Sequence, residues 1–194
     1  MTTTLFTPND AAILLIDHQV GTMRWAASTP FEELKTRALA LARGAKSLEM
    51  PLVLTSSLEE QAQGPLLSDF ADIAPEEYAG RIRRQGAVDA LQDPAFAAAV
   101  EATGRRNLIV AGVTNDVCTV YPVLTALRQG YRVQVVADAG ASITKDADDI
   151  ALRRMERAGA DITSTNQVLA ELAADWASPS GQKVLPIMFD LIPA

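Results

Sequence analysis

Residues 11–16 read Ala-Ala-Ile-Leu-Leu-Ile, an unbroken apolar run that stops at the acidic side chain of Asp17. A strand without polar side chains on either face is typical of a parallel sheet that helices cover on both sides. The run is also far shorter than the roughly 20 residues that a membrane-spanning helix needs. We therefore expect residues 11–16 to form a central strand, with Asp17 at its carboxyl end.

Short apolar runs like this one alternate along the chain with segments of helical periodicity. Further strands are expected at residues 51–55, 107–111, 131–137 and 161–163. Helices are expected from Pro30 to about residue 48, from Asp93 to Gly104, from the loop at 112–116 to Gly130, over 147–158 and over 168–176. The alternation is typical of βαβ units. It predicts an α/β fold of three layers, α/β/α, around a mostly parallel, doubly wound sheet.

Three segments carry more specific expectations. Thr29 to Glu32 predict a capping box, with Pro30 at the first helical position. Residues 56–92 read as mostly irregular, and a stretch of that length in a compact domain usually carries function. The 194 residues suffice for one domain, which we place at residues 1–180. The apolar tail at residues 181–194 either contacts a sister subunit in an oligomer or folds back on its own domain.

The charge balance favours a small molecule as the partner. The chain has 17 basic and 24 acidic residues, a net charge of −7, which disfavours nucleic acid and anionic membranes because both are polyanions. The glycine motifs that bind nucleotides, G-x-G-x-x-G and G-x-x-x-x-G-K-[ST], do not occur. The first ten residues lack the basic region of a signal peptide. We therefore expect a cytoplasmic protein that acts on a small molecule.

Ligands of open parallel sheets bind beyond the carboxyl ends of the strands, where Asp17, the loop at 112–117 and Asp138 are expected. Cys118 follows that loop near the start of a helix, where free N–H groups favour a thiolate. Pro122 cannot donate a hydrogen bond to the Cys118 carbonyl, so the cysteine lies in or before the first turn. A single cytosolic cysteine is usually a buried apolar residue. Both interpretations, nucleophile and core residue, stay open on these grounds.

The chain has one cysteine and one histidine. This excludes a disulfide framework, a cysteine-based zinc site and any serine–histidine triad without His18. Strand alternation points His18 away from Asp17, and no second histidine exists to share a metal, so we expect His18 to be non-catalytic. Asp17 itself is either a cap or a catalytic acid. Arg81, Arg83 and Arg84 form a basic cluster that is usually solvated, although one of them can pair with Asp17.

Three stretches together resemble the isochorismatase-like cysteine hydrolases. They are Asp17-His18-Gln19, then Ala111-Gly112-Val113-Thr114-Asn115-Asp116-Val117-Cys118, and finally Ala126 to Tyr131 leading into Val136 to Ala139. The resemblance extends from about residue 10 to residue 165. Within the superfamily the chain is most similar to the YcaC-like bacterial hydrolases, which share the D-H-Q triplet, the G-P-L at residues 64–66 and a proline four residues after the cysteine.

The resemblance implies a catalytic triad of Asp17, Arg84 and Cys118. Most relatives have lysine where this chain has Arg84, and alignment alone selects Arg84 from the arginine cluster. The resemblance further implies a cis peptide bond between Val113 and Thr114. The backbone N–H groups of Thr114 and Cys118 are then expected to bind the oxyanion of a tetrahedral intermediate.

The implied activity is hydrolysis of an amide-type C–N bond in a small molecule, through a thioester on Cys118. Gln19, Trp25 and Asn115 are expected to contact the substrate. No cofactor and no catalytic metal are expected, because the metal-dependent nicotinamidases of the superfamily use histidines that this chain lacks. The resemblance also implies a homo-oligomer, of which an octamer is one form.

Two alternatives come from other classes of protein. One is a non-enzymatic or redox-sensing relative that uses Cys118 as a reactive thiol. The other is an inert scaffold, in which the thiol would keep an ordinary pKa near 8.5. A thiol pKa below that value is expected for the hydrolase and for the sensor.

Overall fold

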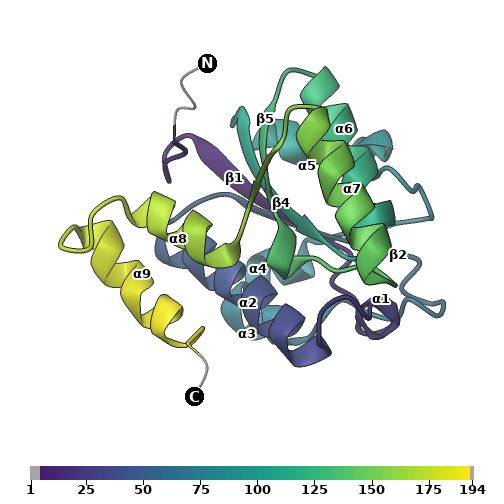
Figure 1. Cartoon of the computed structure of the whole chain (residues 1–194), viewed down its shortest axis with the longest axis horizontal. Helices are drawn as coiled ribbons and strands as arrows, with labels where there is room; N and C mark the ends of the chain where they lie inside the picture. The colour runs from purple at the N-terminus through teal and green to yellow at the C-terminus, as the bar shows by residue number, and fades with distance from the viewer. Residues whose placement is uncertain (1–4, 193–194) are drawn as a thin grey trace.

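The computed structural model describes residues 5–192, and its sheet is parallel throughout. The six strands are β1 (Ala11–Ile16), β2 (Leu52–Ser57), β3 (Ile82–Arg84), β4 (Asn107–Gly112), β5 (Arg132–Val136) and β6 (Asp161–Thr163). Their spatial order is β3-β2-β1-β4-β5-β6. Helices lie on both sides of the sheet (Figure 1). The predicted three-layer α/β/α architecture is confirmed.

The central strand β1 pairs with β2 on one side and with β4 on the other. Ile13 and Leu15 join the apolar core on one face of the sheet, and Leu14 and Ile16 join the core on the opposite face. Burying each of these side chains contributes roughly 1.5–3 kcal/mol to stability. The apolar run at residues 11–16 is therefore a strand that is buried on both faces, as predicted.

Helices form the two outer layers. On one face lie α2 (Phe31–Ser47), α8 (Thr165–Ala173) and α9 (Pro179–Phe189), and on the other α5 (Pro94–Ala102), α6 (Val120–Arg128) and α7 (Lys145–Arg157) (Figure 1). The connections contain α1 (Val20–Trp25), α3 (Asp69–Ile73), α4 (Pro75–Ala79) and the short turns η1 (Ala90–Gln92), η2 (Asn115–Thr119) and η3 (Ala137–Ala139). Within residues 5–192, no helix combines the length and apolar character that crossing a membrane requires.

The strand order reverses between β1 and β4, so their carboxyl ends form the topological switch point of the sheet. The chain leaves β1 toward β2 and β3, whereas β4 leads to β5 and β6 on the other side. The Asp17 N–H donates to the Thr55 carbonyl at 2.9 Å, and the Val113 N–H donates to the Ile16 carbonyl at 3.0 Å. Ligands of doubly wound sheets bind at such a switch point. Asp17 and its neighbours are therefore candidate ligand-binding residues.

The stretch at residues 56–92 is more regular than expected. It contains α3, α4 and the edge strand β3, besides loops. The expectation of a mostly irregular segment overlooks these three short elements. β3 is hard to recognise in the sequence because it has three residues, of which only Ile82 is apolar.

Two helix boundaries also differ from the predictions. α2 begins at Phe31 rather than at Pro30, and no side chain caps its first turn, so the capping box predicted at Thr29 does not form. α8 ends at Ala173, which leaves Trp176 outside the helix and 43% exposed. The difference arises because Trp176 continues the helical spacing, although the backbone leaves the helical conformation at Ala174, where φ is 58°.

The C-terminal tail folds back on its own domain. The predicted boundary at residue 181 lies inside α9, which packs against α2 and α8 and buries Val184 and Ile187. Residues 181–192 thus take the second of the two expected forms, the tail that folds back on its own domain, and the expected boundary falls within a helix. Pro186 lies within α9 and hides its helical pattern in the sequence. Residues 1–4 and 193–194, which the predicted boundaries include, lie outside the described part of the chain.

Candidate active site

A buried ion pair joins Asp17 to Arg84. Nη2 of Arg84 lies 2.5 Å from both carboxylate oxygens of Asp17, and the two side chains are 1–2% exposed. Arg84 ends β3, which is separated from β1 by β2, so its long side chain crosses β2 to reach Asp17. On the way, Nε donates to Thr55 Oγ1 at 3.0 Å, and Nη1 donates to the Ala87 carbonyl. These contacts fix the guanidinium and hold the carboxylate in one orientation.

The other two arginines of the cluster do not reach Asp17. Arg81 makes two hydrogen bonds to Glu59, at 2.7 and 3.0 Å, and lies over the ring of Tyr78. Arg83 is largely exposed and lies 3.4 Å from Glu59. Alternation along β3 explains the difference, because Arg83 faces the opposite side of the strand from Arg84.

The thiol of Cys118 lies beside the Asp17 carboxylate, close enough for each group to shift the pKa of the other. Cys118 belongs to η2, a π-helical turn that leads directly into α6. Asp17 has a left-handed backbone conformation, with φ of 57°, at the residue where β1 ends. The structure thus brings the three residues Asp17, Arg84 and Cys118 together at the carboxyl ends of the strands.

Burial raises the pKa values of both acidic groups. Burial raises the pKa of the Asp17 carboxyl above its usual value, while the charge and hydrogen bonds of Arg84 and the hydrogen bond of Cys118 oppose the shift. The pKa of the Cys118 thiol is raised well above its usual value by burial, then by the charge and hydrogen bond of Asp17. A hydrogen bond with the Thr114 backbone and the charge of Arg84 act in the opposite direction.

The expectation of a lowered thiol pKa is therefore wrong. A helix start favours a thiolate, but here the single guanidinium of Arg84 is already paired with the Asp17 anion. A second anion in the same buried space lacks a counter-charge, which disfavours the thiolate. Asp17 is placed to accept the thiol proton when the sulfur reacts.

The backbone before Cys118 is closely packed. The peptide bond between Val113 and Thr114 is cis, at the position that the resemblance indicates. The Thr119 N–H donates to the Thr114 carbonyl at 3.0 Å and so closes the turn. A Cβ atom on Gly112 would lie 2.6 Å from Thr119 Oγ1 and 3.0 Å from the Ile16 carbonyl oxygen. Glycine is therefore required where β4 passes the end of β1.

The histidine next to Asp17 is buried and directed elsewhere. Nε2 of His18 lies 2.8 Å from the Ala139 carbonyl, and the ring contacts the edge of Phe70. Burial lowers the pKa of His18 to about 4, so the ring is neutral near pH 7. His18 thus connects β1 to η3 and has no contact with the thiol among the interactions of residues 5–192, in line with the expected non-catalytic role.

The three candidates for substrate contact occupy different environments. Gln19 is fully buried: its side chain donates to the Ser57 and Gly64 carbonyls and accepts from the Ser57 N–H. Asn115 is also buried and donates to Asp148. Trp25 is 46% exposed at the end of α1. The geometry gives Gln19 and Asn115 internal hydrogen bonds that shape the site, and only Trp25 presents a free surface.

Asp138, at the end of β5, has a structural contact. Its Oδ1 accepts hydrogen bonds from the N–H and the hydroxyl of Thr165, at 2.7 and 2.9 Å, which ties η3 to the start of α8. Asp138 also lies 3.5 Å from Arg37. Of the acids at the strand ends, Asp17 is therefore the one that meets the cysteine.

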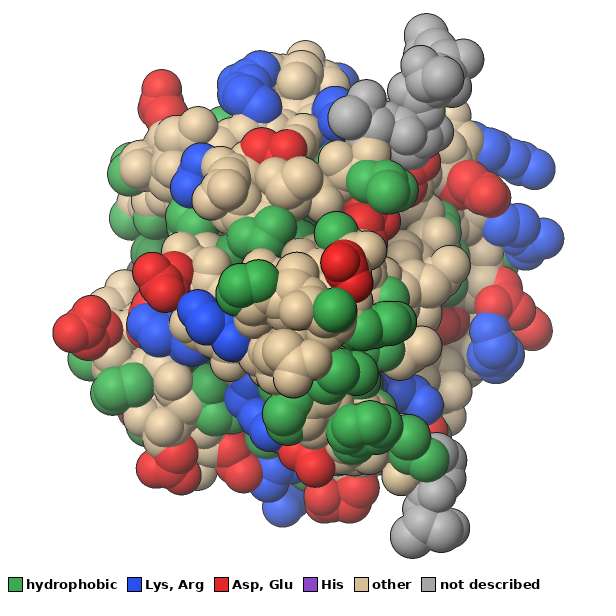
Figure 2. All heavy atoms as spheres, turned by 90° about the vertical axis from the view of Figure 1, so that its left-hand side faces the viewer, with side chains coloured by type: hydrophobic (Ala, Val, Ile, Leu, Met, Phe, Trp, Pro, Cys, Tyr) green, Lys and Arg blue, Asp and Glu red, His purple; other side chains and the backbone are tan. Residues whose placement is uncertain are grey.

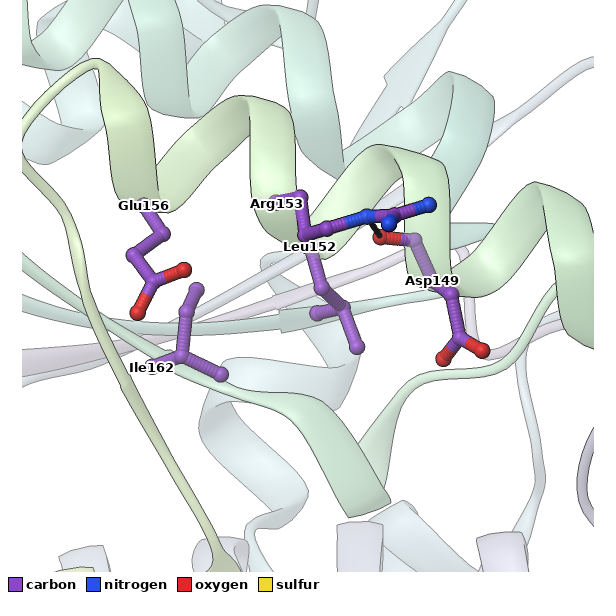
Figure 3. Close-up of a pocket in the computed structure, with 5 residues that line it drawn as sticks. All are labelled: Asp149, Leu152, Arg153, Glu156 and Ile162. Carbon is purple, nitrogen blue, oxygen red and sulfur yellow. Dashed lines mark hydrogen bonds between the residues drawn. The ribbon is translucent and has the colours of Figure 1, made fainter.

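Two hollows on the surface lie near opposite edges of the sheet. A hollow between α7 and β6 is lined by Asp149, Leu152, Arg153, Glu156 and Ile162 (Figure 3), at the far edge of the sheet from Arg84. Another is lined by residues 58–61 and 83–85 and includes Arg84 itself. Within residues 5–192, no three His, Cys, Asp or Glu side chains gather closely enough to bind a metal ion.

The isochorismatase domain family matches residues 11–167, which include Asp17, Arg84 and Cys118. The chain belongs to the isochorismatase family. Within this family it is 36% identical over 168 residues to the probable hydrolase YcaC of Escherichia coli K12, covering 87% of this chain and 80% of the relative. The relatives are named hydrolases, and the chain is an isochorismatase-family hydrolase.

Solved structures of the isochorismatase family agree with this assignment. YcaC from Pseudomonas aeruginosa, in a structure with hexane-2,5-diol and covalent acrylamide, has a TM-score of 0.94 and 35% identity, covering 100% of this chain and 94% of that chain. YcaC from Escherichia coli, described as an octameric hydrolase of unknown specificity, has a TM-score of 0.93 and 34% identity, covering 100% and 93%. The likeness thus spans the complete described fold, including β3 and α9.

Proposed function

We propose that the protein hydrolyses an amide-type C–N bond of a small molecule, with Cys118 as nucleophile, Asp17 as acid and base, and Arg84 as electrostatic support. The observation that carries this proposal is the buried ion pair of Arg84 with Asp17, which lies beside the Cys118 thiol and acts on its pKa. A nucleophile that touches a base, which a third group orients, is the arrangement of covalent catalysis. A screen of small aliphatic amides for released ammonia or amine tests it.

The first half of the reaction forms a thioester. Asp17 accepts the thiol proton while the Cys118 sulfur attacks the carbonyl carbon of the substrate. The N–H groups of Thr114 and Cys118 bind the oxyanion. As the C–N bond breaks, the proton on Asp17 passes to the nitrogen, and the neutral amine leaves. The acyl group is then joined to Cys118, and Asp17 is again an anion.

The second half restores the enzyme. Asp17 accepts a proton from a water molecule, whose oxygen attacks the thioester carbonyl. The C–S bond breaks, the carboxylic acid leaves, and the proton held by Asp17 returns to the sulfur. Arg84 takes no proton because a guanidinium stays charged in proteins. Its function is to orient Asp17 and to balance its negative charge during both halves.

A small substrate fits the burial of the site and the behaviour of a relative. Asp17 and Arg84 are nearly inaccessible, and Cys118 is half-buried. The structure of YcaC from Pseudomonas aeruginosa holds covalent acrylamide, which is both a small amide and an electrophile. Trp25, the exposed candidate, is proposed to border the substrate, whereas Gln19 and Asn115 are proposed to shape its surroundings from within.

The pH dependence of Cys118 alkylation separates this proposal from the alternatives. Because burial and Asp17 raise the pKa of the thiol, the alkylation rate with iodoacetamide should rise with a midpoint above the usual 8.5–9. Asp17→Asn removes the negative charge beside the thiol, so its midpoint should be lower. A midpoint near 8.5 in both proteins would suit an inert scaffold, and a midpoint below 7 with rapid oxidation by peroxide would suit a redox sensor.

We also propose that the protein is a homo-oligomer, which one relative supports by its octameric form. Apolar side chains gather beside the C-terminus on the α9 side of the molecule (Figure 2), where Phe189 and Ile192 are 63% and 64% exposed. Exposed apolar clusters mark interfaces. Replacing both residues with serine should lower the molar mass measured by light scattering, whereas Ile150→Ser on α7 should not. A parent protein that is monomeric at micromolar concentration would contradict the proposal.

A further inference from the structure

A second buried carboxylate, that of Asp148, packs against the nucleophile turn and has no part in the steps above. Asp148 lies in the first turn of α7 and is 6% exposed. Its Oδ1 accepts a hydrogen bond from Asn115 Nδ2 at 3.0 Å and another from Ser142 Oγ at 2.9 Å. Asn115 begins the turn that carries Cys118, and Ser142 belongs to the loop after η3. One oxygen atom thus joins two segments that flank the nucleophile.

These two segments also contact each other directly. The Asn115 N–H donates to the Ala141 carbonyl at 2.8 Å, and the Asp116 N–H donates to Ser142 Oγ at 3.3 Å. The Ser142 hydroxyl therefore donates to Asp148 and accepts from the turn, and Asp148 fixes its orientation. Gly140 presses against the Asn115 side chain, since a Cβ atom there would lie 2.3 Å from Asn115 Oδ1. The turn is held by hydrogen bonds and by close packing.

Ser142 connects the same network to the segment that follows the acid. Its carbonyl accepts from the N–H groups of Ala27 and Ser28, at 2.9 and 3.1 Å, and its N–H donates to Ser28 Oγ at 2.9 Å. These residues come directly after α1, which itself begins three residues after Asp17. Asp148 thus stabilises the arrangement of the Cys118 turn relative to the chain that leads from Asp17.

We propose that Asp148 is a positioning residue, which holds the Cys118 turn and its Thr114 and Cys118 N–H groups in place against Asp17. Its importance for catalysis rests on the proposed function, but its effect on the thiol can be measured without turnover. A simpler role would be to stabilise the start of α7, as acids at helix N-termini do. Asp146 shares that position in the first turn but is exposed. It is therefore the matched control.

The test compares Asp148→Ala, Asp148→Asn and Asp146→Ala by the pH dependence of Cys118 alkylation with acrylamide. Cys118 is the only cysteine, so the intact mass reports the reaction. When the turn relaxes, the thiol becomes more hydrated and moves away from Asp17. Asp17 and Arg84 are the charged groups that act on the thiol. The midpoint of Asp148→Ala should therefore fall by about one pH unit. Asp148→Asn keeps a carbonyl oxygen that accepts both hydrogen bonds, so it and Asp146→Ala should match the parent.

Two results would overturn the proposal. One is an Asp148→Ala protein, folded by circular dichroism, whose midpoint equals that of the parent. The other is an Asp148→Asn midpoint that falls as far as that of Asp148→Ala, because the charge would then matter rather than the hydrogen bonds. If Asp148→Ala does not fold, Ser142→Ala takes its place, because it removes one of the two hydrogen-bond donors to Asp148. An alkylation midpoint of Ser142→Ala equal to that of the parent would then overturn the proposal. A parent without amide turnover would refute the proposed function while leaving these midpoints interpretable.

Discussion

Replacing Cys118 with alanine should reduce amide hydrolysis by at least about 10⁴-fold, because removal of the nucleophile of a covalent mechanism leaves only binding and oxyanion contacts. The change removes one half-buried sulfur from the core beside α6. It should alter the free energy of unfolding by about 1 kcal/mol. Released amine gives the rate, and circular dichroism with thermal melting establishes that the variant is folded.

Cys118→Ser provides the matched control for this loss. A hydroxyl in place of the thiol keeps a hydrogen-bond donor for Asp17 and nearly the same volume, yet it is a far poorer nucleophile at neutral pH. Turnover should therefore fall strongly in both variants while the melting temperature of the serine variant stays near that of the parent. Turnover of Cys118→Ala within tenfold of the parent would show that the sulfur is not the nucleophile.

Replacing Arg84 with methionine should cost about 3–5 kcal/mol of unfolding free energy near pH 8, because the Asp17 anion is left buried without its partner. Without the guanidinium, the pKa of Asp17 rises further above its unfolded value. The loss should therefore be smallest below about pH 4, where the carboxyl is protonated in both states, and should grow as the pH rises through the folded pKa. Urea unfolding at several pH values measures this dependence.

Two variants make the Arg84 result specific. Arg83→Met removes a guanidinium from the same strand, but that side chain is exposed and 3.4 Å from Glu59, so its effect should stay below about 1 kcal/mol. Arg84→Lys keeps the charge and should recover part of the stability and turnover, although one ammonium cannot replace the contacts to Asp17, Thr55 and Ala87. An Arg84→Met protein as stable as Arg83→Met would show that the pair has no structural importance.

The central part of the fold and the positions of Asp17 and Cys118 could be predicted from local sequence, whereas their catalytic roles came from the family resemblance. The run at residues 11–16 has one explanation, a strand buried on both faces, and the acid that ends it must lie at the edge where ligands bind. Cys118 could be placed near a helix start because Pro122 limits where the helix continues. These inferences need only the chain's own order and the geometry of parallel sheets.

The choice of Arg84 depends on tertiary structure. Three arginines within four residues look alike in the sequence, and β3 is too short to show a clear strand pattern. One signal does exist: Ile82 is apolar and packs against the core, so alternation places Arg84 on the same side and Arg83 on the other. That signal becomes useful only when residues 82–84 are known to be a strand.

The burial of Asp148 and the direction of the thiol pKa shift also depend on tertiary structure. Asp148 lies between Asp146 and Asp149, in a segment whose charged sequence suggests exposure to solvent. Its spacing nevertheless places it on the same helix face as the buried residues Ala151 and Met155. That spacing could have identified it as buried. The direction of the Cys118 pKa shift follows from burial and then from the charge of Asp17, and no local pattern reveals that Asp17 and Arg84 are already paired beside the thiol.

The central claim, that Cys118 forms a thioester with the acyl group of a small amide, is tested most directly by intact-mass measurement of protein that is acid-quenched during turnover. The claim predicts that the parent protein gains the mass of the acyl group of each amide it hydrolyses, that hydroxylamine removes this mass, and that Cys118→Ala never acquires it. Steady turnover with no such mass in the parent under rapid quenching, together with undiminished turnover in Cys118→Ala, would contradict the claim.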